Sequence, residues 1–221
     1  MHYNTKEIFN YYLRDIKLNK RKHWNSYTVE DDEDDNVDTF SDFTFSYGAS
    51  KFVIVPEISD YVIKIPFNLR YDDDLLFDSA YYAEDDDYGW DYCRSEAQYY
   101  RLAKEEGLES FFAETRYIGS KHGYPIYVQE KCLPYSEAVN SNSKKDIETT
   151  ERKISTLANA VPRDMSMNFL TELFKTASEE TIDRLFNFIY RNRIYDLRDA
   201  NCGFLIKNNK PVLVDYASFN E

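Results

Sequence analysis

The sequence contains few of the residues that form disulfides or bind metals through nitrogen or sulfur. Its 221 residues include three histidines and three cysteines. Cys93, Cys132 and Cys202 are far apart in the chain, and no CxxC occurs. A sparse, odd-numbered set of cysteines is typical of a reducing compartment rather than of a disulfide framework. The histidines form no pair at metal-ligand spacing, so a zinc site is not predicted.

Long apolar runs and excess positive charge are also missing. No stretch approaches the roughly 18 apolar residues of a membrane span, and the first residues lack the apolar core of a signal peptide. We therefore expect a soluble, cytoplasmic protein that does not bind membranes. The net charge is −13, which argues against direct binding of nucleic acid, because Lys and Arg supply the affinity for a phosphate backbone.

Acidic and aromatic residues are abundant instead. Aromatic residues make up 17% of the chain and hydrophobic residues 43%, enough for a substantial core. The acidic residues gather in two runs, one from Asp31 to Asp38 and one within residues 72–91. Such runs are usually solvated loops. Because the second run includes Tyr81 and Trp90, we also consider an acidic protein that imitates DNA, or one that attracts a protein partner with a basic surface.

Apolar periodicity divides the chain into three regions. Residues 1–42 predict a helix over 5–22 followed by an acidic linker. Residues 43–132 predict a small sheet with one helix that ends at Gly107, interrupted by an acidic insert over 68–91. The strands are expected at 43–47, 51–55, 61–65, 113–118 and 125–131, with a hairpin joining 51–55 to 61–65.

The remaining residues, 133–221, predict a mainly helical region with a β-hairpin near its end. Residues 136–146 read as a linker, and helices follow up to Arg191, the last of them beginning at Ser178. Strands are expected at 203–206 and 211–214. The whole pattern predicts an α+β fold with two lobes.

The C-terminal hairpin carries the best candidates for chemistry. Asp196 and Asn201 lie five residues apart, just after the last predicted helix, and Asp215 ends an apolar strand. A hairpin would bring Asn201 and Asp215 together, and oxygen ligands of this kind suit Mg²⁺. Considered alone, Asp196 and Asp199 could also be ordinary turn residues.

These residues resemble the motifs of the protein-kinase-like superfamily, including minimal kinase-like proteins of bacteria and their phages. Residues 194–201, IYDLRDAN, are similar to the catalytic loop H-R-D-L-x-x-x-N, and residues 215–217, DYA, to D-F-G. Residues 61–65, YVIKI, look like the V-A-I-K strand, and Glu96 lies on the helix that follows. The resemblance runs from about residue 43 to the end of the chain.

The resemblance implies a phosphotransferase that uses ATP and Mg²⁺. Asp196 would orient the acceptor hydroxyl, Lys64 paired with Glu96 would hold the α- and β-phosphates, and Asn201 and Asp215 would bind Mg²⁺. The nucleotide would also meet the glycine-rich loop through Gly48 and Ser50, and the hinge through Glu130 and Cys132.

The sequence also differs from the kinase-like motifs at several positions, and each difference leads to an expectation. Ile194 and Tyr195 stand where the family has His and Arg, so other residues must brace the catalytic loop. Only six residues follow Asp215, so we expect a reduced helical lobe without the region that docks peptide substrates. Two alternatives therefore stay open: a pseudokinase that acts as a binding module, and the acidic inhibitor described above.

Overall fold

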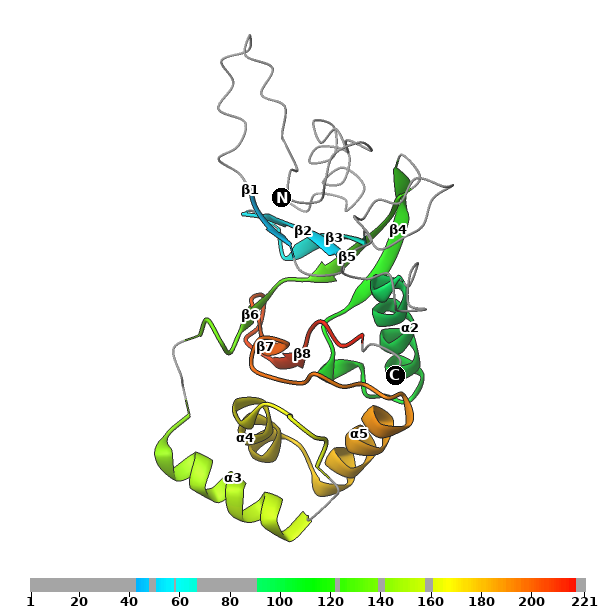
Figure 1. The fold of residues 1–221 in the computed structure, drawn as a ribbon. Helices are drawn as coiled ribbons and strands as arrows, with labels where there is room; N and C mark the ends of the chain where they lie inside the picture. Colours follow the sequence, from blue (N-terminus) through cyan, green and yellow to red (C-terminus); the bar gives the residue numbers. More distant parts are fainter. Residues whose placement is uncertain are drawn as a thin grey trace, which may run out of the picture. The chain divides into compact units, whose positions relative to one another are not determined.

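In the computed structural model, the described part of the chain forms an α+β protein (Figure 1). The described residues are 43–47, 51–57, 59–66, 91–121, 124–138, 142–157 and 161–217. The predicted helix over 5–22, the acidic run from Asp31 to Asp38 and most of the insert over 68–91 lie outside them.

The chain forms two compact units. Unit 1 takes the residues up to Cys93 together with Arg116–Val128, and unit 2 takes Arg94–Thr115 together with the residues from Gln129 onward. The sequence predicts a boundary near residue 132. Unit 2 instead includes most of the helix that was expected before this boundary, because that helix packs into the core of unit 2.

Unit 1 contains a five-stranded sheet in the order β1-β2-β3-β5-β4. Its strands are β1 (Phe43–Tyr47), β2 (Lys51–Pro56), β3 (Tyr61–Pro66), β4 (Thr115–Lys121, whose first residue belongs to unit 2) and β5 (Tyr124–Glu130, whose last two residues belong to unit 2). The predicted hairpin is confirmed, since β2 and β3 pair antiparallel with Val53 opposite Lys64. Buried β-branched side chains, including Ile54, Ile63 and Ile126, form the core of this unit, as the strand preference of such residues leads us to expect.

Unit 2 contains four helices among its described residues. They are α2 (Tyr92–Glu105, whose first two residues belong to unit 1), α3 (Lys144–Leu157), α4 (Met167–Thr176) and α5 (Glu179–Arg191). α2 ends just before Gly107, whose φ of +68° gives the left-handed turn that commonly ends a helix. In Figure 1, α4 lies between α3 and the sheet of this unit.

The region predicted as a linker, 136–146, contains the start of α3. Ser143 Oγ accepts a hydrogen bond from the Asp146 backbone N–H (3.2 Å), and Asp146 Oδ2 accepts one from the Ser143 backbone N–H (3.1 Å). These reciprocal bonds form a capping box, which stabilises the first turn of a helix. The polar composition of the segment had hidden this start signal.

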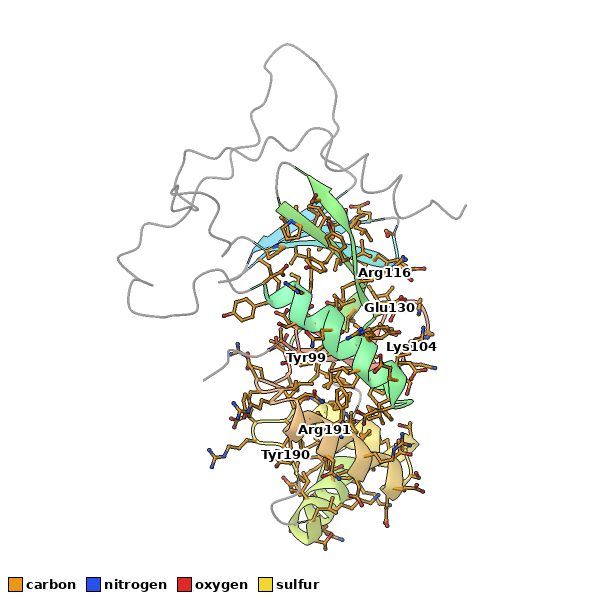
Figure 2. All side chains as sticks on the ribbon, turned by 90° about the vertical axis from the view of Figure 1, so that its right-hand side faces the viewer. Tyr99, Lys104, Arg116, Glu130, Tyr190 and Arg191 are labelled. Carbon is orange, nitrogen blue, oxygen red and sulfur yellow. The ribbon has the colours of Figure 1, made fainter. Side chains whose placement is uncertain are left out.

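The last helix agrees closely with its prediction. Ser178 caps α5 by accepting from the Thr181 backbone N–H, and the predicted stripe is buried against the core at Ile182, Leu185, Phe186 and Ile189. At its other end, Arg191 (Figure 2) pairs with Glu106, which follows α2. α5 is thereby fixed to the C-terminal end of α2.

The three-stranded sheet of unit 2 has the order β6-β7-β8. It comprises β6 (Cys132–Pro134), β7 (Cys202–Leu205) and β8 (Pro211–Leu213), so the predicted C-terminal hairpin is confirmed. β6 approaches β7 so closely that a Cβ added at Gly203 would lie 2.1 Å from the carbonyl oxygen of Leu133. Only glycine fits at this position.

Candidate functional site

The hairpin of β7 and β8 brings the two predicted metal ligands to one place. The Val214 backbone N–H donates to the Asn201 carbonyl oxygen at 2.8 Å. Asn201 is therefore paired with the residue that precedes Asp215. Both residues belong to unit 2, Asn201 buried and Asp215 half-buried.

Asn201 also binds Asp196. Its Nδ2 donates to the backbone oxygen of Asp196 at 2.7 Å and to Oδ2 of the same residue at 2.9 Å. Since one N–H points to the backbone and one to the carboxylate, the amide fixes the loop and the orientation of its acid together. Asp196, Asn201 and Asp215 thus form one cluster, which we call the loop cluster.

Arg198 is a fourth member of this site that the sequence did not single out. Its Nε lies 2.9 Å from Asp196 Oδ1, and its Nη2 lies 3.1 Å from Oδ2. This two-pronged pair fits the planar shapes of both groups. The side chains remain open to solvent, with 51% of the Asp196 side chain exposed, so an incoming ligand can reach the carboxylate. The only sequence signal is a cation two residues after a candidate catalytic acid.

The loop over residues 194–201 is held by hydrogen bonds to the start of α4. Asp199 accepts from the Ser166 hydroxyl and, at 3.1 Å, from Asn168 Nδ2. The Ser166 backbone N–H donates to the carbonyl oxygen of Leu197 at 2.7 Å. Ser166 also caps α4 by accepting from the Phe169 backbone N–H. The start of α4 therefore holds this loop in place.

The two sides of the loop face different environments. Ile194 and Leu197 are buried in the core of unit 2, while Tyr195 and Asp196 are exposed. The buried side chains at both ends of this segment anchor the loop to the core, and the acid between them stays on the surface. Ile194 therefore serves as a core residue.

Two members of the loop cluster have left-handed backbone conformations. Asp196 has φ +57° and Asp215 has φ +54°, and the other described non-glycine residues in this region are Asp164, Arg193 and Asn209. Asp and Asn tolerate this region better than most residues. Conformations that cost energy are often found at functional sites.

Tyr216, which follows Asp215, is a core residue. Its ring is fully buried and packs edge-on against Phe112, with 5.1 Å between ring centroids. Its hydroxyl donates to the Ala113 carbonyl oxygen at 2.8 Å. Burial raises the pKa of this hydroxyl well above its usual value, so the group stays protonated and can serve as a donor.

Glu96, the predicted partner of Lys64, is 0% exposed on α2. Its Oε2 accepts from Gln129 Nε2 at 3.0 Å, and the same nitrogen donates to Thr115 Oγ1 at 2.7 Å. A buried carboxylate is costly unless hydrogen bonds satisfy it, and Gln129 supplies one. This contact cannot be predicted from the sequence, because Gln129 lies 33 residues after Glu96.

The hinge residues have structural partners of their own. Glu130 (Figure 2) accepts from the Glu114 backbone N–H at 3.0 Å through Oε2 and pairs with Lys207 through Oε1. Cys132 is half-buried and pairs with Leu205 between β6 and β7. The side chain of Glu130 therefore connects the end of β5 to Lys207, which lies between β7 and β8.

The remaining predicted site residues belong to unit 1. Lys64 lies on β3 and is only 4% exposed, which is unusual for a lysine. Gly48 and Ser50 lie outside the described residues. Among the described residues, no group of three or more His, Cys, Asp or Glu side chains could hold a metal ion, and no helix is long and apolar enough to cross a membrane.

Comparisons with known proteins add no assignment. No protein-family model, curated protein or solved structure matches the chain. Function must therefore be argued from the site itself.

Proposed function

We propose that this protein is a kinase-like phosphotransferase that uses ATP and Mg²⁺. The observation that carries the proposal is the loop cluster, in which Asn201 bonds to Asp196 and is paired with the residue before Asp215. Phosphoryl transfer requires a carboxylate that orients the attacking hydroxyl and oxygen ligands for a metal. The segments on either side of the β7–β8 hairpin carry candidates for both.

The donor set fits Mg²⁺. Asn201 and Asp215 offer oxygen atoms, which this ion prefers. Mg²⁺ usually takes only one or two protein ligands and completes its shell with water and substrate phosphates, so a site without three clustered carboxylates is suitable. When bound, the ion would neutralise charge on the phosphates.

Each residue then has a stated role. Asp196 accepts the proton of the acceptor hydroxyl, and its exposed carboxylate leaves room for that acceptor. Arg198, paired with Asp196 through two nitrogen atoms, orients the carboxylate. Lys64 and Glu96 enter the proposal from the sequence resemblance, as the residues that hold the α- and β-phosphates.

The test uses substitutions that keep the left-handed backbone. We expect the wild-type protein to bind ATP more tightly with Mg²⁺ than without it, as measured by calorimetry. Asp215→Asn should raise the Mg²⁺ concentration for half-saturation at least about tenfold. Asp196→Asn should retain binding but lower phosphate transfer at least about a hundredfold.

Asp164→Asn is the matched control, because Asp164 has φ +57° and is exposed outside the loop cluster. It should behave as wild type. Transfer is followed as phosphate released to water and as label incorporated into cell extract, since the acceptor is unknown. Absence of Mg²⁺-dependent ATP binding by the wild-type protein contradicts the proposal. Binding without any transfer identifies a nucleotide-binding module instead.

A further inference from the structure

A chain of buried polar groups connects α2 to the segment that carries Asp215. It runs from Glu96 through Gln129 and Thr115 to Tyr216, and all four side chains are buried. Gln129 Nε2 lies 3.0 Å from Glu96 Oε2 and 2.7 Å from Thr115 Oγ1. The Tyr216 hydroxyl oxygen lies 3.1 Å from Thr115 Oγ1. We call these four residues the buried polar chain.

Each group of the buried polar chain has a hydrogen-bond partner within it or next to it. Gln129 has two N–H hydrogens, which serve the Glu96 carboxylate and the Thr115 hydroxyl oxygen. The Ala113 carbonyl oxygen lies 2.8 Å from the Tyr216 hydroxyl and 3.3 Å from the Thr115 hydroxyl, and it accepts from this pair of hydroxyl groups. The two hydroxyl oxygens are 3.1 Å apart. Thr115 therefore connects Gln129 to Tyr216.

The same region is held by the backbone as well. The Ala113 backbone N–H donates to the Leu213 carbonyl oxygen at 2.9 Å, so both ends of Ala113 contact the segment from Leu213 to Tyr216. Asp215 lies between these two attachments. Its position is therefore set on one side by β8 and on the other by the Tyr216 hydroxyl.

Core packing alone does not require this chemistry. The Tyr216 ring would pack against Phe112 without a hydroxyl, and burying polar groups costs free energy that an apolar set would avoid. A fully bonded polar chain instead selects one arrangement. Its two ends adjoin residues with proposed functions: Glu96, itself a proposed site residue, and Asp215, which precedes Tyr216.

We infer that the buried polar chain positions Asp215 for metal binding, with Gln129, Thr115 and Tyr216 as positioning residues that link this segment to Glu96. The inference rests on the proposed function for the role of Asp215. It adds residues that touch neither nucleotide nor metal, and it predicts that α2 and the Asp215 segment respond together to loss of any one bond.

The test compares two tyrosine-to-phenylalanine substitutions in the full-length chain. Tyr216→Phe removes the bonded hydroxyl and keeps the ring. Tyr135→Phe is the matched control, because the Tyr135 hydroxyl is buried without a hydrogen-bond partner among the residues that the structure describes. Both changes remove one oxygen atom from a buried aromatic side chain of unit 2.

The first measurement needs no ligand. Amide hydrogen exchange of residues 214–217 should become about fivefold faster in Tyr216→Phe, as expected for one lost hydrogen bond. It should be unchanged in Tyr135→Phe. Gln129→Met, which keeps side-chain length but not the hydrogen bonds, should accelerate the same amides. The double variant should add little to the larger single effect, because the chain acts as a unit.

The second measurement is the Mg²⁺ dependence of ATP binding. Tyr216→Phe should raise the half-saturating Mg²⁺ concentration about fivefold, with ATP affinity in the absence of Mg²⁺ unchanged. A purely structural role would lower thermal stability without this selective effect. If Tyr216→Phe binds Mg²⁺ as wild type does, the inference is overturned.

The two measurements separate the inference from the proposed function. If the wild-type protein binds no Mg²⁺-ATP, the proposed function fails, and the exchange data alone decide the positioning. Faster exchange in Tyr216→Phe than in Tyr135→Phe supports the buried polar chain as the device that holds the Asp215 segment. Equal exchange in the two variants refutes it.

Discussion

Asp199→Ala tests the hydrogen bonds that connect the loop over residues 194–201 to the start of α4. Asp199 accepts two hydrogen bonds, from the Ser166 hydroxyl and from Asn168 Nδ2. Hydrogen bonds to charged groups each contribute about 1.5–3 kcal/mol. Asp199 is half-buried, so water replaces part of this energy in the variant. We therefore expect a loss of about 2–3 kcal/mol in the free energy of unfolding.

Urea denaturation followed by the helical circular dichroism signal measures this loss, because α3, α4 and α5 all belong to unit 2. With an m-value of about 2 kcal/mol per molar urea, the unfolding midpoint should fall by about 1 M. The Ser166 cap of α4 should survive, since its bond to the Phe169 backbone N–H does not involve Asp199.

Asp183→Ala is the control for loss of one negative charge. Asp183 is exposed on α5, and its replacement should change the free energy of unfolding by less than about 0.5 kcal/mol. If Asp199→Ala lowers the midpoint no more than Asp183→Ala does, the hydrogen bonds of Asp199 do not brace the loop.

Three further predictions use the same denaturation assay. Gly203→Ala should lower the free energy of unfolding by about 3 kcal/mol, because the new Cβ would lie 2.1 Å from the Leu133 carbonyl oxygen. A decrease of less than about 1 kcal/mol would contradict the close approach of β6 and β7. Burial raises the pKa of Tyr216 above 10.0 and that of the Cys202 thiol above 9.0. The folded state therefore favours the neutral forms of both groups, and their contribution to the free energy of unfolding is complete below pH 9.0. The free energy of unfolding should fall as the pH rises further, and it should fall less steeply in Tyr216→Phe. An identical decrease in the variant would contradict the burial of the hydroxyl. Arg198→Ala should change stability by less than about 0.5 kcal/mol, because its pair with Asp196 is exposed, and a larger loss would show that the pair is structural.

Local signals in the sequence predicted most elements of unit 2. The apolar stripe of α5 and its cap at Ser178 depend on residues within one or two turns of each other, and so does the turn between β7 and β8. The start of α3 was missed although its capping box is also local, because residues 136–146 were read by polarity alone. The hairpin that pairs Asn201 with Val214 was predicted for the same local reason.

The long-range hydrogen bonds of the site could not be predicted from the sequence. Asp199 bonds to Ser166 from 33 residues away, and Gln129 bonds to Glu96 across the same separation. Such contacts depend on how helices and strands pack, and one sequence carries no periodicity that reports them. The sequence suggested that a brace was needed at Ile194 and Tyr195, but not where it would come from.

The sequence alone therefore determined which residues could carry chemistry and which short segments would be helix or strand, because both depend on side-chain type and near neighbours. The tertiary structure decided which of those residues share a hydrogen-bond network. It assigned Glu96, Gln129 and Tyr216 to one buried polar chain and left the Asp196 carboxylate at the surface. The physical reason is that burial and long-range hydrogen bonding are properties of the packed chain.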